Sequence, residues 1–463
     1  MTLIKSISGI RGTIGGAPGT NLTPLDAVKF AAAYGTWLKE HVEDNLPSVV
    51  IGRDARISGP MIQNLVQQTL IGMGINVIDL GLSTTPTVEI AVPLENADGG
   101  IILTASHNPK QWNALKLLND KGEFLNAIEG EKILQLAENE SFDFSGVDDL
   151  GNITPKGGYM DIHVQEVLNL DLVNAEQIRA GKFKVVVDGV NSSGGLAIPK
   201  LLDALGVEYV PLYCEPTGQF PHNPEPLKEH LGDLCAEVVA HQAAFGIVVD
   251  PDVDRLAFVD EKGEMFGEEY TLVACADYVL GKTKGNTVSN LSSTRALRDV
   301  TNSHGGAYVA AAVGEVNVVT AMKETHAVIG GEGNGGIIYP ASHYGRDALV
   351  GIALFLMLLS ERKIPVSELK SGYPSYFMSK KKIQLTPQLD VDGILDTMRD
   401  NYRDEEVSTV DGVKIDFSDS WVHMRKSNTE PIIRIYTEAG NQEDADKLAD
   451  HIIQEIKDIA NLA

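Results

Sequence analysis

One local pattern occurs three times along the chain: a short β-branched run, a turn, an amphipathic stretch, a glycine and a second apolar run. The copies cover residues 49–78, 185–210 and 287–309. Short apolar runs that alternate with helical patterns are typical of βαβ units, in which a helix joins two strands of a parallel or mixed sheet. The chain is therefore expected to contain three similar mixed-sheet α/β domains in series.

The C-terminal part of the chain follows a different pattern. Its candidate elements are a Lys-rich strand at 378–385, a helix at 391–402, a hairpin at 411–425, a strand at 432–437 and an amphipathic helix at 443–459. Paired strands that are covered by helices predict a separate α+β domain. Because 463 residues are too many for a single core, we expect several domains. These are 1–155, 156–258, 259–370 and 371–463.

The charge of the chain limits its partners. Lys and Arg number 38 against 64 Asp and Glu, which gives a net charge of −26. Such a field repels nucleic acid and anionic membrane, so neither is an expected partner. An anionic ligand would need a local cluster of Arg and Lys to overcome this field.

The sequence also predicts a cytoplasmic location. Cys214, Cys235 and Cys275 have no metal-binding spacing and suit a reducing compartment. The N-terminal residues lack the apolar core of a signal peptide. The apolar run 348–359 is too short to span a bilayer.

The loop Thr-Ala-Ser-His-Asn-Pro at 104–109 follows an apolar run at 99–103. It is therefore expected at the carboxyl end of a strand, where open α/β sheets bind their ligands. The hydroxyl of Ser106, flanked by His107 and followed by Lys116, can accept a phosphoryl group there. Ser, Asn and Pro are also ordinary turn residues, so the functional interpretation depends on the other loops.

The loop Asp-Pro-Asp-Val-Asp-Arg at 250–255 also follows an apolar run. Asp250, Asp252 and Asp254 place hard oxygen donors around one point, which suits Mg²⁺. Arg255 adds a fixed cation for a phosphate or a carboxylate. The alternative without function is an acidic surface turn.

Two further interpretations of this loop compete with magnesium. With Glu261, the aspartates have the spacing of a calcium EF-hand, but Arg255 occupies the position of the required glycine and 256–259 reads as a strand. A haloacid-dehalogenase-type site would use an aspartate as the phosphoryl acceptor. In that motif Asp254 replaces the usual Thr or Val, and we keep this mechanism as the alternative.

Two more loops offer groups for a sugar phosphate. Gly-Gly-Glu-Gly-Asn-Gly-Gly at 330–336 lets the backbone approach a ligand closely, and Glu332 and Asn334 suit sugar hydroxyls. Arg-Lys-Ser-Asn-Thr-Glu-Pro at 425–431, with Arg434 beyond it, concentrates cations and hydroxyls in an acidic chain. Such a set indicates a phosphate cradle.

These four loops, in this order and one per expected domain, resemble the α-D-phosphohexomutase superfamily over essentially the whole chain. The resemblance implies four domains around a central cleft, with Ser106 as the phosphoserine. It also implies that the three aspartates hold Mg²⁺ together with the serine phosphate. The other implied residues are Arg11, His107, Lys116 and Arg255 near the serine, Glu332 and Asn334 for the sugar, and Arg425, Ser427, Asn428, Thr429 and Arg434 for the distal phosphate.

The implied reaction interconverts hexose 6-phosphate and hexose 1-phosphate. The phosphoserine phosphorylates the free hydroxyl, and the resulting hexose 1,6-bisphosphate turns over and returns its other phosphate to Ser106. Mg²⁺ and the bisphosphate are the implied cofactors, a small sugar phosphate is the partner, and the chain is expected to be a monomer or homodimer. A non-catalytic sugar-phosphate binding protein is the alternative from another class, although such a protein needs neither the serine nor the aspartates.

Departures from the family pattern bear on the sugar. Several glucose- or mannose-phosphate mutases carry a histidine where this chain has Gly336, and a Gly-His-Ser segment where it has Val-Gly-Glu-Val-Asn at 313–317. That segment, like the Thr-Glu-Pro of the fourth loop, looks more like the phosphoglucosamine mutases. The extra carboxylate of Glu315 would favour an ammonium group. We therefore expect glucosamine phosphate in preference to mannose or glucose phosphate.

Overall fold

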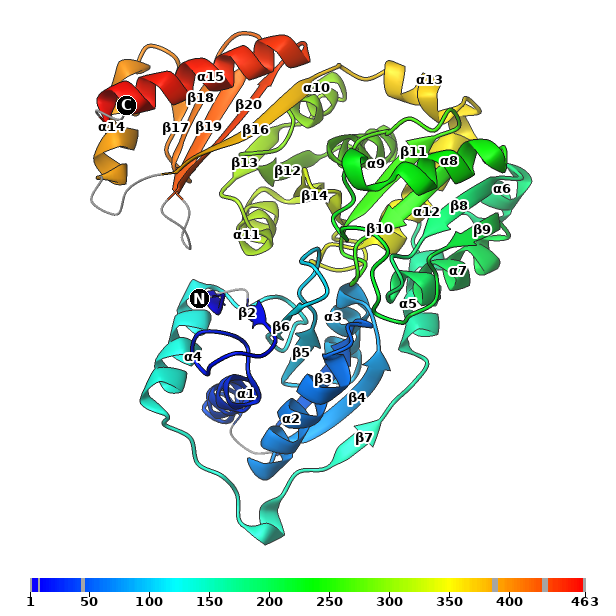
Figure 1. Cartoon of the computed structure of the whole chain (residues 1–463). Helices are drawn as coiled ribbons and strands as arrows, with labels where there is room; N and C mark the ends of the chain where they lie inside the picture. Colours follow the sequence, from blue (N-terminus) through cyan, green and yellow to red (C-terminus); the bar gives the residue numbers. More distant parts are fainter. Residues whose placement is uncertain (1, 7–8, 43–45, 385–389, 427–431, 461–463) are drawn as a thin grey trace.

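The computed structural model describes residues 2–6, 9–42, 46–384, 390–426 and 432–460. It contains four β-sheets, and we name domains I to IV after them in chain order. Figure 1 shows that the chain bends through the two middle sheets, so that the first and last sheets lie on the same side of the molecule.

Domain I has a seven-stranded sheet in the order β1-β2-β6-β5-β3-β4-β7. Its strands are β1 (Ile4–Ser6), β2 (Gly9–Thr13), β3 (Ser48–Arg53), β4 (Asn76–Leu82), β5 (Gly99–Leu103), β6 (Trp112–Leu118) and β7 (Ile153–Pro155). Its helices are α1 (Pro24–Lys39), α2 (Gly59–Gly72), α3 (Thr85–Leu94) and α4 (Ala127–Asn139). Strands β3, β4 and β5 are parallel, whereas β6 runs antiparallel to β5. The β5–β6 connection therefore leaves the carboxyl end of β5.

Domains II and III repeat a smaller layout. Their four-stranded sheets have the orders β11-β10-β8-β9 and β13-β12-β14-β15, each with three parallel strands and one antiparallel strand. The strands are β8 (Lys184–Asp188), β9 (Glu208–Leu212), β10 (Phe245–Val249), β11 (Leu256–Asp260), β12 (Asn286–Asn290), β13 (Tyr308–Ala311), β14 (Ala327–Glu332) and β15 (Gly336–Ile338). The helices are α5 (Tyr159–Leu168), α6 (Ala175–Ala180), α7 (Gly194–Leu205), α8 (Gly232–Ala240), α9 (Glu268–Lys282), α10 (Ala296–Ser303), α11 (Glu315–Thr325), α12 (Ala348–Arg362) and α13 (Val366–Ser371).

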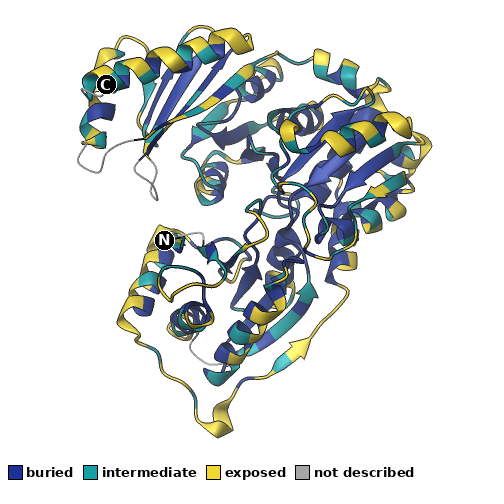
Figure 2. Ribbon diagram, viewed as in Figure 1, coloured by how far each residue is buried: buried dark blue, intermediate teal, exposed yellow. Residues whose placement is uncertain are grey.

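The two middle domains share one apolar core. Helices α9 and α12 pack against each other, and their side chains join those of both sheets in a single buried cluster. Phe258 of β11 stacks on Phe355 of α12 with ring centroids 3.9 Å apart. Figure 2 shows this region as the most continuously buried part of the molecule. No helix in the described part of the chain is both long and apolar enough to cross a membrane.

Domain IV differs from the others, as the sequence predicted. Its five-stranded sheet has the order β16-β20-β19-β18-β17, and every pairing is antiparallel. The elements are β16 (Phe377–Gln384), α14 (Val391–Asn401), β17 (Glu406–Ser408), β18 (Val413–Asp416), β19 (Trp421–Lys426), β20 (Ile432–Ala439) and α15 (Gln442–Ile459). Helices α14 and α15 pack on the sheet.

The expected fold class is confirmed. Each of the three repeated patterns forms two parallel strands joined by a helix, namely β3-α2-β4, β8-α7-β9 and β12-α10-β13. Three mixed α/β sheets are followed by an α+β domain. The domain limits after 155, 258 and 370 stay a proposal, because the shared core of domains II and III gives no sharp break in packing.

Candidate active site

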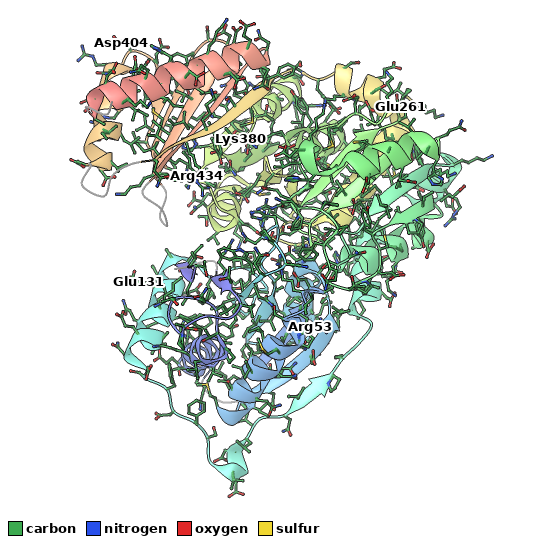
Figure 3. All side chains as sticks on the ribbon, viewed as in Figure 1. Arg53, Glu131, Glu261, Lys380, Asp404 and Arg434 are labelled. Atoms are coloured by element: carbon green, nitrogen blue, oxygen red, sulfur yellow. The ribbon has the colours of Figure 1, made fainter. Side chains whose placement is uncertain are left out.

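A cavity of about 1250 Å³ lies where the four domains meet. The predicted site residues that line it are Arg11, His107, Lys116, Arg255, Glu332, Asn334, Arg425 and Arg434. Figure 3 shows Arg434 at the end of the fourth sheet that faces domain I. Ser427, Asn428 and Thr429 lie outside the described residues.

The loop after β5 holds Ser106 in a constrained conformation. The backbone of Ser106 has φ of +48°, which non-glycine residues adopt infrequently. Its N–H donates to Thr104 Oγ1 at 2.9 Å, and the Thr104 hydroxyl donates to Asp54 Oδ2 at 2.7 Å. Arg56 donates to the carbonyl oxygens of Ser106, Asn108, Pro109 and Trp112.

Asp54 and Arg56 are site residues that the sequence interpretation missed. Both are completely buried and form an ion pair of 2.9 Å. They follow the carboxyl end of β3, as Ser106 follows that of β5. The rule that selected the serine loop would therefore have selected them too.

The hydroxyl of Ser106 faces the aspartate loop of domain II. Ser106 Oγ donates to Asp250 Oδ2 at 2.6 Å. His107 Nδ1 lies 3.4 Å from Ser106 Oγ. Only 5% of Ser106 is exposed. The structure thus brings together a reactive oxygen, a carboxylate and an imidazole that come from two domains.

The three aspartates form a buried cluster between β10 and β11. One ligand oxygen from each lies within 4.8 Å of the others, and all three residues are completely buried. Backbone N–H groups of Asp254 and Arg255 donate to Asp250 Oδ1 at 3.2 and 3.1 Å. Burial, and then the charges of Asp252 and Asp254, raise the pKa of Asp250 well above its usual range.

This cluster fits a divalent cation. The Oδ1 atoms of Asp252 and Asp254 are buried and have no hydrogen-bond donor among the described residues. Orphaned carboxylate oxygens are costly unless a cation satisfies them. An all-oxygen set of this kind suits Mg²⁺. The following residues form β11 instead of an EF-hand helix, as the sequence predicted.

Cations surround the other carboxylate oxygens. Lys116 Nζ lies 2.6 Å from Asp252 Oδ2 and 3.1 Å from Asp254 Oδ2. Burial alone would lower the pKa of Lys116, but the two aspartates raise it above its ordinary value. Lys116 is therefore a permanent cation in this arrangement.

His107 is held in its neutral form. Burial lowers the pKa of His107 well below its usual value, and the cations Arg255 and Arg11 lower it further. Arg11 on β2 and Arg255 after the aspartate loop both line the cavity beside it. A neutral imidazole next to a hydroxyl can accept a proton.

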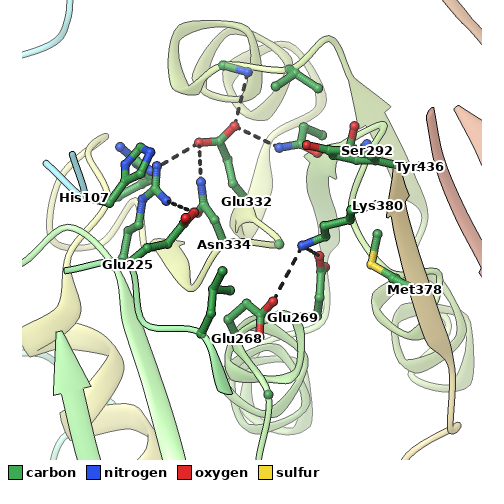
Figure 4. A pocket seen from close by; sticks show the side chains of 18 of the residues that line it. His107, Glu225, Glu268, Glu269, Ser292, Glu332, Asn334, Met378, Lys380 and Tyr436 are labelled. Carbon is green, nitrogen blue, oxygen red and sulfur yellow. Dashed lines mark hydrogen bonds and ion pairs between the residues drawn. The ribbon is translucent and has the colours of Figure 1, made fainter. Parts of the chain in front are cut away.

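Glu332 is held by hydrogen bonds at the carboxyl end of β14 in the third sheet. Its Oε1 accepts from Asn290 Nδ2 at 2.8 Å and from the N–H of Gly314 at 3.2 Å. The Nδ2 of Asn334 lies 3.4 Å from its Oε2. Figure 4 shows these contacts converging on Glu332 within the cavity. The carboxylate and the amide are thus oriented for a polar ligand.

Arg346 is a third site residue that the sequence interpretation missed. Its guanidinium contacts Asp254 Oδ2 at 2.7 Å, Glu315 Oε2 at 2.9 Å and Glu332 Oε2 at 3.3 Å. A Cβ at Gly336 would collide with Cδ of Arg346. The glycine that departs from the family pattern therefore leaves the space that Arg346 fills. In the sequence, Arg346 was marked only by its position directly before Asp347, the N-cap residue of the apolar helix α12.

Arg425 and Arg434 stand opposite each other on neighbouring strands. They are register partners in the antiparallel pair β19 and β20, and both side chains line the cavity. Like charges at directly opposite positions destabilise a sheet. Asp411 offsets part of the charge of Arg425, and a bound phosphate would offset the charge of both arginines, which supports the predicted phosphate cradle.

A carboxylate at the junction of domains III and IV gives a testable pH effect. Glu269 Oε2 accepts from the N–H of Thr294 at 2.9 Å, and Lys380 of β16 lies 3.9 Å from Oε1. Figure 4 shows Lys380 facing both Glu268 and Glu269. Burial raises the pKa of Glu269 to about 8, although Lys380 opposes this rise.

Because the folded state holds this proton more tightly than the unfolded state, stability falls as pH rises from the unfolded pKa of 4.5 through about 8. The Glu269→Gln variant should lack this contribution. We expect the wild type to lose about 1–3 kcal/mol relative to the variant between about pH 6 and about pH 9, measured by denaturant unfolding. Glu268→Gln, which alters the other partner of Lys380, is the control and should follow the wild type. Equal pH profiles for wild type and Glu269→Gln would contradict the assignment.

The chain matches four family models in order. They are phosphoglucomutase/phosphomannomutase α/β/α domain I at 3–144, domain II at 161–263, domain III at 267–376 and the C-terminal domain at 379–455. The chain is 35% identical to a phosphoglucomutase/phosphomannomutase of Thermococcus kodakarensis, over 94% of this chain and 95% of the relative. It is 32% identical to a probable phosphoglucosamine mutase of Methanopyrus kandleri, over 97% of each.

The solved structures agree. A phosphoglucomutase/phosphomannomutase family protein of Burkholderia thailandensis superimposes with a TM-score of 0.83 and 26% identity, covering 98% of each chain. The chain therefore belongs to the phosphoglucomutase/phosphomannomutase family. It is an intramolecular phosphotransferase of the phosphohexomutase class.

Proposed function

We propose that the chain interconverts hexose 6-phosphate and hexose 1-phosphate through a phosphoserine at Ser106, with glucosamine phosphate as its preferred substrate. The observation that carries this proposal is the contact of 2.6 Å between Ser106 Oγ and Asp250. It joins a reactive hydroxyl to a buried carboxylate cluster beside a cavity that all four domains line.

The residues near Ser106 suit both half-reactions. In the first, the phosphoryl group leaves Ser106 Oγ for a free sugar hydroxyl, whose proton passes to a base such as the neutral His107, while Asp250 returns a proton to Ser106 Oγ. In the second, the other phosphate of the bisphosphate transfers to Ser106 Oγ, whose proton passes to Asp250 Oδ2, while the proton held by His107 goes to the sugar oxygen that is released. Arg11, Lys116 and Arg255 offset the charge on the transferring group.

Asp250, Asp252 and Asp254, with the serine phosphate, would hold Mg²⁺. The ion would neutralise charge that develops on the phosphoryl oxygens. The unpartnered Oδ1 atoms of Asp252 and Asp254 are the support for this assignment. Hexose 1,6-bisphosphate is proposed as the intermediate and activator.

The far end of the cavity would hold the phosphate that does not react. Arg425 and Arg434 would supply positive charge there, and Ser427, Asn428 and Thr429 are proposed as neutral hydrogen-bonding ligands of the same phosphate. Glu332 and Asn334 would bind the sugar hydroxyls between the two ends. A site with one reactive end and one passive phosphate cradle can accept the bisphosphate in both orientations.

The preference for glucosamine rests on the segment 313–317 and on the relatives that carry the phosphoglucosamine mutase name. Glu315 already accepts a hydrogen bond from Arg346 Nε at 2.9 Å. An ammonium group would therefore share this carboxylate with Arg346 instead of binding a free one. The cytoplasmic location and the monomer or homodimer state stay predictions.

A comparison of kcat/KM between substrates tests the sugar assignment. We expect kcat/KM for glucosamine 6-phosphate to exceed the values for mannose 1-phosphate and glucose 1-phosphate by about tenfold or more, because specificity is a ratio of these constants. The assay contains Mg²⁺ and a trace of the matching hexose 1,6-bisphosphate. Near-equal values would overturn the glucosamine preference but leave the mutase reaction intact. Ligand binding without turnover of any substrate would favour the non-catalytic binder.

A further inference from the structure

Asp411 contacts two residues that line the cavity, Arg425 of domain IV and Val313 of domain III. It belongs to the turn between β17 and β18 in domain IV, and its side chain is 21% exposed. Asp411 Oδ2 lies 2.7 Å from Nε of Arg425 and accepts from the N–H of Val313 at 3.0 Å. One carboxylate oxygen thus contacts a proposed phosphate ligand and the backbone of domain III.

The backbone contact leads directly to the proposed sugar ligand. Val313 precedes Gly314, and the N–H of Gly314 donates to Glu332 Oε1 at 3.2 Å. Gly314 has φ of +115°, a conformation that a side chain would strain. A shift of Asp411 would therefore move the N–H of Val313, which is adjacent in the backbone to the N–H that holds Glu332.

A second route runs through His423 of β19. Its Nε2 lies 2.6 Å from the carbonyl oxygen of Asp411, which can only accept, so Nε2 carries the proton. Its Nδ1 then accepts from the hydroxyl of Ser292 at 2.9 Å. Burial lowers the pKa of His423 to about 4, so this neutral tautomer persists near neutral pH.

Ser292 also leads to Glu332. Its N–H donates to Asn290 Oδ1 at 2.9 Å, and Asn290 Nδ2 donates to Glu332 Oε1 at 2.8 Å. Both hydrogen-bonded groups that hold Glu332 Oε1 are therefore connected, through one or two residues, to Asp411.

We propose that Asp411 is a positioning residue that couples phosphate binding by Arg425 to sugar binding by Glu332. Asp411 forms an ion pair at the Nε edge of the guanidinium, without an aligned hydrogen bond, and leaves the terminal nitrogens for the phosphate. The same carboxylate holds the N–H of Val313, in the peptide next to the one whose N–H orients Glu332. This inference rests on the proposed function, because that proposal assigns Arg425 and Glu332 to the two ends of one ligand.

Docking of domain IV alone does not require Asp411. Arg295 at the start of α10 contacts Asp416 Oδ1 at 3.0 Å and the carbonyl of Ser420 at 2.9 Å. Glu438 accepts from the N–H of Arg295 and from Trp421 Nε1. The contacts of Arg295 join domains III and IV without Asp411, and they provide a matched control.

A double-mutant cycle tests the coupling. The variants are Asp411→Asn, Glu332→Gln and their combination, and the readout is the dissociation constant of glucose 1,6-bisphosphate by calorimetry with Mg²⁺ present. Coupled residues give non-additive effects. We expect the combined loss of affinity to fall short of the product of the single losses by about fivefold or more. Additive effects would overturn the proposal.

The control cycle replaces Asp411→Asn with Asp416→Asn, whose effect should be additive with Glu332→Gln. Coupling of equal size in this control cycle would show that domain docking alone is responsible, and it would overturn the role of Asp411. If Asp411→Asn melts far below the wild type, His423→Gln takes its place in the cycle with the same expectation. Wild-type binding without turnover would refute the mutase reaction and leave the cycle valid. If the wild type did not bind glucose 1,6-bisphosphate, both the mutase reaction and the coupling through Asp411 would be refuted.

Discussion

Replacing Ser106 by alanine is expected to lower kcat of the mutase reaction by at least about a thousandfold. The substitution removes the oxygen that is proposed to carry the phosphoryl group between the two half-reactions. It leaves the carboxylate cluster and the cavity in place. Turnover is measured with a trace of hexose 1,6-bisphosphate, and the phosphate on the protein is located by mass spectrometry of its peptides.

Ser193→Ala is the control, because Ser193 is another buried serine and its hydroxyl has no partner among the described residues. This variant should retain activity and the phosphate on Ser106. Full activity of Ser106→Ala would exclude the phosphoserine mechanism. Phosphate on Asp250 or Asp252 would instead support the haloacid-dehalogenase-type mechanism that the sequence left open.

The sequence predicted the repeated fold because each βαβ unit is encoded locally. The strand Ser48–Arg53, the helix Gly59–Gly72 and the strand Asn76–Leu82 follow from apolar periodicity and one turn glycine. The same reasoning located Ser106 and the aspartates, since both follow apolar strands. These predictions needed no knowledge of contacts between distant residues.

Contacts with distant partners could not be predicted in this way, even for Arg56, whose position after β3 marks it as a candidate. Arg56 contacts carbonyl groups about fifty positions further along the chain, and Arg346 contacts Asp254 from another domain. No local pattern records such a contact. The shared core of domains II and III was missed for the same reason, because α9 and α12 pair only after the chain has folded back.

Arg346→Ala is expected to lower kcat/KM by about a hundredfold to a thousandfold, because three buried carboxylates share its guanidinium and Lys116 contacts only Asp254 among them. Asp254 and Glu332 would both lose the guanidinium that lies 2.7 and 3.3 Å from them. Arg346→Lys should recover only part of the loss, since one ammonium cannot reach three carboxylates in the planar arrangement of an arginine. Steady-state kinetics measure kcat/KM of both variants. A Mg²⁺ titration of thermal stability measures how the loss of the guanidinium affects the carboxylate cluster.

Gly336→Ala tests the same arrangement without removing the charge. A methyl group at this position collides with Cδ of Arg346, so the guanidinium should be displaced and the activity should fall in the same direction. Gly157→Ala is the control, because a Cβ at Gly157 meets no atom within 4 Å. If Gly336→Ala kept full activity while Arg346→Ala lost it, the charge of Arg346 would matter but its position against Asp254 and Glu332 would not. Full activity in both variants would show that Lys116 alone neutralises the aspartate loop.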